Sequence, residues 1–106
     1  MNTRVRMAGV VLLGLSAVAP MLAQDAGADT YKAKCQSCHG ATGMADTGAG
    51  KAMKVKAASD AEVKAMTEDQ MIAVVTDGKG KMPAYKGKLT DAQIKDSVAY
   101  YRTFVK

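Results

Sequence analysis

Both cysteines and the only histidine of this 106-residue chain lie in one pentapeptide, Cys35-Gln36-Ser37-Cys38-His39. On a helical turn, residues three apart lie on one face, so the two thiols point the same way. The imidazole of the next residue then lies beside them. The chain therefore places all its thiol and imidazole chemistry at one point, and the fold has to leave room there for what these groups bind.

The spacing Cys-x-x-Cys-His is the attachment sequence for c-type haem. Each of the two thiols can add to one vinyl group of a porphyrin, and the imidazole that follows lies under the ring, where one nitrogen binds iron. We therefore expect one covalent haem c, attached through Cys35 and Cys38, with His39 as an iron ligand. The other imidazole nitrogen is then free to be oriented by a hydrogen-bond acceptor.

Three other kinds of site use the same residue types. A disulfide between Cys35 and Cys38 would close a very small loop and stabilise little. A thioredoxin-like redox pair needs a βαβ context, and the sequence shows no strand-like alternation. A structural zinc ion normally takes four Cys or His ligands, whereas the chain has three such residues. Haem attachment is therefore the favoured interpretation.

Residues 1–23 have the order of a secretory signal peptide: Arg4 and Arg6, then an uncharged run over 7–23 rich in Val, Leu and Ala. An uncleaved anchor is the alternative, but the run is short for a membrane span, which needs about 20 apolar residues. We expect cleavage near Ala23, export to the periplasm and no stable membrane anchor. Residues 24–106 then form one small domain, and few domains of this size build a strong core from side chains alone.

The mature chain begins with a helix and a loop. The spacing of Tyr31 and Cys35 predicts a helix over 28–38. Four glycines over 40–50 predict a loop. The basic segment 51–58 has no clear pattern, and we expect a loop with at most one helical turn.

Three later segments start with Ser or Thr and carry Glu or Gln three residues on, which is the pattern of a capping box at a helix start. They begin at Ser59, Thr67 and Thr90. They predict helices over 59–65, 67–77 and 91–105. The last helix has an apolar stripe formed by Ile94, Val98, Tyr101 and Val105. The chain is therefore expected to be all-α, with about four helices.

Met82 is the candidate for the second iron ligand. It lies in the glycine- and lysine-rich segment 78–88, and Pro83 stiffens the backbone next to it. A loop of this kind can bring a thioether to the open face of the ring. His/Met ligation raises the reduction potential, which suits an electron carrier.

The other methionines are weaker candidates. Met1, Met7 and Met21 belong to the leader. Met71 lies in an expected helix, where a thioether packs in the core, and Met66 closes a short expected helix. Met44 follows His39 by five residues and is too near to reach the opposite face of the ring. Met53 is the one competitor.

The formal net charge of +5 falls to +3 without the leader, which is too small and too evenly mixed for nucleic-acid binding. We expect a monomeric, single-haem periplasmic electron carrier rather than an enzyme, acting between redox partner proteins. Four lysines flank Met82 and can either meet an acidic partner or keep the surface solvated: Lys79, Lys81, Lys86 and Lys88. The alternative is a haem enzyme or ligand sensor with a labile sixth position, but no second His exists to serve it.

Over residues 27–105 the sequence resembles the class I cytochromes c, and among them the small bacterial cytochromes similar to cytochrome c6. The haem signature at 35–40, the segment 78–85 around Met82 and the C-terminal segment 98–102 carry the resemblance. It implies the cytochrome c fold wrapped around one covalently bound haem, with the first and last helices crossing at near right angles. It also implies a carrier that docks by an exposed haem edge.

One departure from the family concerns the second nitrogen of His39. Many members have a Pro in the loop after the signature, and its carbonyl accepts the hydrogen bond from the axial histidine. The segment 40–50 contains no Pro. Another backbone carbonyl of this loop is the expected substitute.

Overall fold

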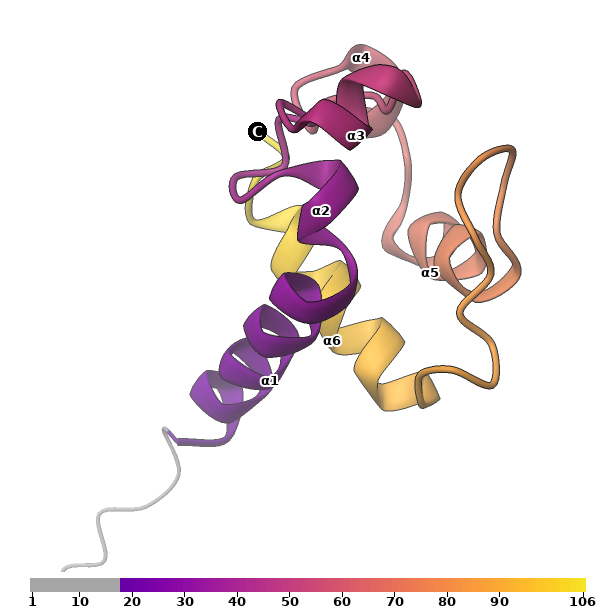
Figure 1. The fold of residues 1–106 in the computed structure, drawn as a ribbon. Coiled ribbons are helices and arrows are strands. Elements are labelled where there is room, and N and C mark those ends of the chain that lie inside the picture. Colours follow the sequence, from indigo (N-terminus) through magenta and orange to yellow (C-terminus); the bar gives the residue numbers. More distant parts are fainter. Residues whose placement is uncertain (1–17) are drawn as a thin grey trace, which may run out of the picture.

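The computed structural model describes residues 18–106, so residues 1–17 of the predicted signal peptide lie outside the described residues. Over residues 18–106 the chain forms six helices and no strands, which confirms the all-α prediction (Figure 1). In chain order they are α1 (Val18–Lys34), α2 (Gln36–His39), α3 (Gly48–Ala52), α4 (Ala61–Lys64), α5 (Glu68–Asp77) and α6 (Asp91–Arg102). None of the described helices is long and apolar enough to cross a membrane.

The helices α1 and α6 cross in direct backbone contact (Figure 1). A Cβ atom on Gly27 would lie 2.3 Å from the carbonyl oxygen of Asp96, so no other residue fits there without a shift of the helices. One turn later Tyr31 is only 1% exposed, and its ring packs at 5.3 Å from the ring of Tyr100. Gly27 and Tyr31 therefore form the α1 side of the crossing between α1 and α6.

Two of the three predicted capping boxes are confirmed. The Thr67 side chain accepts from the Gln70 amide at 3.1 Å and the Gln70 side chain accepts from the Thr67 amide at 2.9 Å, which starts α5. Thr90 and Gln93 make the same pair of bonds at the start of α6. These caps work within four residues, so the local sequence is enough to predict them.

The predicted capping box at Ser59 is wrong, although the short helix itself is present. The N-cap of α4 is Asp60, whose Oδ1 accepts from the Glu62 amide at 2.9 Å. Asp is as good an N-cap residue as Ser, and here the later of the two neighbouring candidates takes the position.

The helix predicted over 28–38 is interrupted at Cys35, which separates α1 from α2. The loop predicted over 40–50 is wrong at its end, because the short helix α3 begins at Gly48 and continues to Ala52 in the next segment. α6 ends at Arg102, not at residue 105, because the chain tightens there: the amides of Thr103 and Phe104 donate to carbonyls three residues back.

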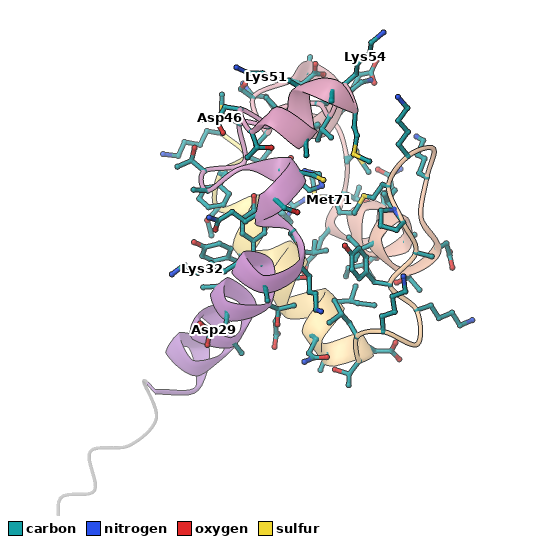
Figure 2. All side chains as sticks on the ribbon, in the orientation of Figure 1. Asp29, Lys32, Asp46, Lys51, Lys54 and Met71 are labelled. Carbon is teal, nitrogen blue, oxygen red and sulfur yellow. The ribbon has the colours of Figure 1, made fainter. Side chains whose placement is uncertain are left out.

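The C-terminal core joins α4, α5 and α6 around Val63, Met71 and Val98, all buried. Partly buried side chains pack against these three: Met66, Ile72, Val75, Tyr101 and Val105. Met71 lies near the centre of the molecule, whereas Lys51 and Lys54 lie at its edge (Figure 2). The apolar stripe predicted for the last helix therefore does face the core, with Ile94 and Val98 both buried.

Candidate haem site

The pentapeptide of cysteines and histidine forms one helical turn directly after α1. The Cys35 amide donates to the Tyr31 carbonyl at 2.8 Å, and the His39 amide donates to the Cys35 carbonyl at 2.9 Å. Gly40 ends the turn at φ +82°, in the region that favours glycine. Two thiols and an imidazole are thus held together on one short helical segment, as their spacing predicts.

The Tyr31 hydroxyl holds this turn against α1. It donates to the Gly40 carbonyl at 2.6 Å, and the bond is buried. Burial raises the pKa of Tyr31, so the hydroxyl keeps its proton and remains a donor throughout the physiological range. The end of the signature is therefore fixed by a side chain from the helix crossing.

Cys35 and Cys38 are both free and half-buried, so no disulfide joins them. Burial raises the pKa of Cys35 to about 11, which leaves this thiol protonated at neutral pH. Redox-active thiols of the thioredoxin kind have lowered pKa values. The structure therefore disfavours both the disulfide and the thioredoxin-like alternative.

The His39 imidazole is prepared for a ligand. Burial lowers its pKa, so the ring is neutral at neutral pH, the state in which an imidazole binds a metal. Its Nδ1 is buried and has no hydrogen-bond partner among residues 18–106. The substitute carbonyl that we expected in the loop after the signature is thus not found. Instead, the Tyr101 ring packs edge-on at 5.5 Å from the imidazole.

Met82 is half-buried in the loop that joins α5 to α6. The amides of Lys79 and Met82 donate to each other's carbonyls at 3.1 and 3.0 Å, which closes a tight turn. Gly78 starts this turn at φ +77°, and a Cβ there would come within 2.9 Å of the Met82 carbonyl oxygen. The backbone on which the thioether is carried is therefore fixed.

Tyr85 fastens this loop to the rest of the site. Its hydroxyl donates to the carbonyl of Lys34, the residue before Cys35, at 2.9 Å. Its amide donates to the Val75 carbonyl in α5 at 2.9 Å. One residue thus links the segment that carries Met82 to the cysteine segment, which lies 51 positions earlier in the sequence.

Two adjoining cavities lie between these segments. The first, of about 420 Å³, extends toward α4, α5 and α6, and the second, of about 490 Å³, extends along the cysteine segment and the Met82 loop. Five residues line both cavities: Cys35, His39, Val55, Lys79 and Met82. The imidazole and the thioether that the sequence singled out therefore border the same space.

The remaining methionines take other places. Met53 lines only the second cavity, 38% exposed, with its Sδ 3.8 Å from Cys38 Sγ. Met44 is 43% exposed and lines neither cavity. Met66 and Met71 line the first cavity, and Met71 is a core residue, as expected. Met82 is thus the only methionine common to both cavities in the described part of the chain.

Some residues of the site have no motif in the sequence. Tyr101 belongs to the predicted apolar stripe, but nothing local indicates that its ring packs on His39. The bond from Tyr85 to Lys34 joins distant segments and has no local signal. Val55, at the junction of both cavities, lies in a segment without a clear pattern.

These residues fit a covalent haem. Two free thiols, a neutral imidazole with a buried, unpaired Nδ1 and a thioether border the two adjoining cavities. The wall of the first cavity includes valines from four segments: Val55, Val63, Val74, Val75 and Val98. Thiols for attachment and a His/Met pair for iron are the donor set of a cytochrome c. Within residues 18–106, no group of three His, Cys, Asp or Glu side chains forms another metal site.

Comparison with known proteins gives the same answer. A family model described as cytochrome C oxidase, cbb3-type, subunit III matches residues 22–100. Cytochrome c6 of Nostoc sp. (strain PCC 7120) is 40% identical over 95 residues, covering 87% of this chain and 82% of the relative. Cytochrome c6 of Leptolyngbya boryana is 46% identical over 76 residues, covering 72% of this chain and 85% of the relative.

A solved structure agrees with the sequence matches. The KustC0563 c-type cytochrome superposes with a TM-score of 0.68 at 30% identity, covering 76% of this chain and 98% of that one. The fold around the signature is thus shared along nearly the whole length of a known haem protein. The chain therefore belongs to the small class I c-type cytochromes similar to cytochrome c6, and it is an electron carrier with one covalently bound haem c.

Proposed function

We propose that this cytochrome is a periplasmic carrier whose haem is attached at Cys35 and Cys38 and whose iron is ligated by His39 and Met82. The observation that carries the proposal is that His39 and Met82, from separate parts of the fold, line the same two cavities. The haem supplies the one-electron chemistry, and the protein binds, orients and tunes it.

The chain's own groups are in the states that this role needs. The lowered pKa of His39 leaves its imidazole neutral and able to donate a lone pair. The Met82 thioether is uncharged and takes up no proton, so its charge stays the same whether the haem iron is oxidised or reduced. The wall of the first cavity is mostly apolar, which favours the oxidation state of the haem that has the lower charge. Little has to move between oxidation states, because hydrogen bonds at Lys79 and Tyr85 already hold the loop.

A carrier fits better than a haem enzyme or a ligand sensor. Such a protein needs a labile sixth position and distal groups for acid–base chemistry. The chain has no second histidine, and the acidic residue that lines the first cavity, Glu62, is ion-paired with Lys56. We therefore propose that the protein is not an enzyme.

The exposed edge of the site supports docking to an acidic protein partner. The second cavity contains both cysteines and is lined by four lysines and no acidic residue. These are Lys34, Lys54, Lys79 and Lys81. Of the lysines singled out in the sequence, Lys86 and Lys88 are exposed but line neither cavity. Charge around an exposed edge speeds encounter with a partner of opposite charge.

The association rate with an acidic redox partner tests this docking surface. We expect the rate to fall steeply as ionic strength rises, and the variant Lys81→Gln to weaken that dependence more than Lys64→Gln, which lies outside the cavity. A flat response to ionic strength would remove the docking role.

The ferric methionine–iron charge-transfer band in the red tests the ligand assignment. We expect it in the wild type, in Met53→Ala and in Met44→Ala, and we expect its loss in Met82→Ala. If the band survived in Met82→Ala and disappeared in Met53→Ala, the ligand would be Met53.

The leader assignment completes the proposal. We propose that residues 1–23 are a signal peptide and that residues 24–106 form the exported cytochrome domain, acting as a monomer. The basic start and the uncharged run support this. Fractionation with mass spectrometry tests it: a cytoplasmic protein that retained Met1 would contradict it.

A further inference from the structure

One ion pair at the first cavity is not explained by the site described so far. Lys56 and Glu62 line this cavity but not the second one. The other charged residue of its wall, Lys79, also lines the second cavity together with both cysteines. Lys56 and Glu62 are therefore the charged groups that belong to the end of the site away from Cys38.

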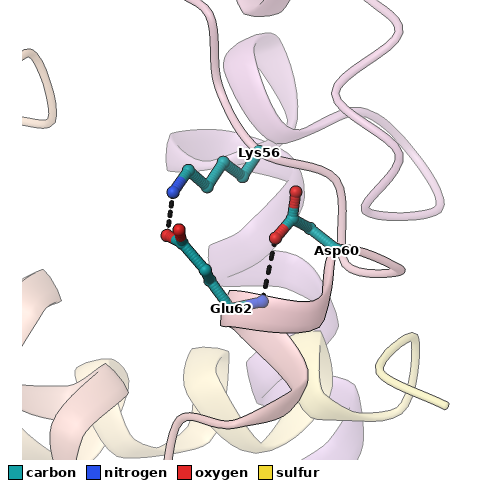
Figure 3. Close-up of polar contacts among 3 residues, drawn as sticks. All are labelled: Lys56, Asp60 and Glu62. Atoms are coloured by element: carbon teal, nitrogen blue, oxygen red, sulfur yellow. Dashed lines mark hydrogen bonds and ion pairs between the residues drawn. The ribbon is translucent and has the colours of Figure 1, made fainter.

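The pair is built on a fixed backbone. Lys56 Nζ donates to Glu62 Oε2, and Asp60 Oδ1 accepts from the Glu62 amide at 2.9 Å, which caps α4 (Figure 3). The hydrogen bond to Glu62 raises the pKa of Lys56, so the ammonium stays charged. The Lys56 and Glu62 side chains are 52% and 75% exposed, and exposed pairs of this kind stabilise a fold very little. Stability therefore does not account for a charged pair beside an apolar cavity.

The chemistry of the haem accounts for it. A haem carries its two vinyl groups and its two propionate carboxylates on different edges. Thioether links at Cys35 and Cys38 would hold the vinyl edge at the cysteine segment, so the carboxylates would lie at the other end of the site. A carboxylate in a mostly apolar site needs a cation or hydrogen-bond donors. An ammonium has three N–H donors and can serve two carboxylates at once.

Resting on the proposed attachment at Cys35 and Cys38, we propose that Lys56 binds a haem propionate and that Glu62 is a positioning residue that holds the Lys56 ammonium there. The positive charge of Lys56 then favours the added electron, since reduction lowers the charge of the haem. Glu62 opposes this effect in part and keeps the lysine from turning into solvent.

Matched substitutions in the haem-loaded protein test the proposal. Lys56→Gln removes the same charge as Lys64→Gln, which lies on α4 but lines neither cavity. We expect Lys56→Gln to lower the reduction potential clearly more than Lys64→Gln. We expect Glu62→Gln to release the Lys56 ammonium and so to weaken its contact with the propionate, whereas Glu68→Gln, which makes the same change on α5, leaves that contact intact.

Resonance Raman spectroscopy of the propionate bending mode separates contact from charge alone. We expect the mode to shift in Lys56→Gln, to stay unchanged in Lys64→Gln and to return toward its wild-type position in Lys56→Arg. If the potential and the mode changed equally in Lys56→Gln and Lys64→Gln, or in neither, the proposal would be overturned. Failure of the underlying function looks different, because the wild type itself would then lack covalent haem.

Discussion

Replacing Tyr31 with phenylalanine removes one hydroxyl and leaves the aromatic packing in place. Tyr31 is 1% exposed, and its hydroxyl donates to the Gly40 carbonyl at 2.6 Å in the interior. Without the hydroxyl, the buried carbonyl keeps only the amide of Gly43, at 3.3 Å. Leaving a buried acceptor poorly paired costs about 1–3 kcal/mol. Because one weak bond remains, we expect Tyr31→Phe to lower the free energy of unfolding by about 1–2 kcal/mol.

Tyr85→Phe is the matched control for this substitution. Its hydroxyl also donates to a backbone carbonyl, that of Lys34, at 2.9 Å, but the bond is exposed. Water can replace it there, so we expect a loss below about 0.5 kcal/mol.

Guanidinium unfolding of the haem-loaded proteins, followed by circular dichroism, measures the free energy of unfolding of both variants. The comparison holds where the variants and the wild type have equal m-values. The same loss in both variants, or no loss in Tyr31→Phe, would show that the buried bond does not hold the signature.

Three further changes have defined outcomes. Gly27→Ala should destabilise the protein by about 1–3 kcal/mol, as overpacking does, because a Cβ would lie 2.3 Å from the Asp96 carbonyl; thermal melting measures it, and an unchanged melting temperature would deny the close crossing. Thr90→Ala should cost about 1 kcal/mol by removing the cap of α6, whereas Thr103→Ala, at the other end, should cost less; equal losses would contradict the capping box. Burial raises the pKa of Tyr31, so its contribution to stability is complete below the ordinary tyrosine pKa of about 10 and falls at higher pH, where the unfolded chain loses the proton first. Denaturation at pH 9 to 11 should therefore show a smaller alkaline loss in Tyr31→Phe than in the wild type, and parallel curves would refute this.

The parts of this fold that the sequence predicts are those decided within a few residues. In each capping box, the two side chains accept hydrogen bonds from each other's backbone amides, as in the pairs Thr67–Gln70 and Thr90–Gln93. Each of these helix starts can therefore be predicted from four consecutive residues. Gly78 ends α5 with a positive φ, which glycine favours, and the end of that helix was also predicted. The same local rule failed at α4, because Ser59 and Asp60 are both good caps and only the folded chain selects one.

The parts that the sequence does not predict depend on contacts between distant segments. The packing of Tyr101 on His39 joins α6 to α2, and no local pattern marks the break between α1 and α2 at Cys35. The bond from Tyr85 to Lys34 joins the Met82 loop to the cysteine segment across 51 positions of the sequence. The loop after the signature lacks Pro, and the structure shows no substitute acceptor for His39 Nδ1 among residues 18–106. No pattern in the sequence could report this, since it depends on where each carbonyl points.

The central claim is that two thioether bonds fasten one haem to the pentapeptide at residues 35–39. The intact mass of the exported, denatured and acid-acetone-extracted protein tests it most directly. We expect the mass of a chain starting near residue 24 plus one haem, and we expect the haem to stay on the peptide that contains Cys35 and Cys38 after proteolysis. A colourless chain with the mass of the bare polypeptide, or haem that passes into the acidic acetone, would contradict the claim.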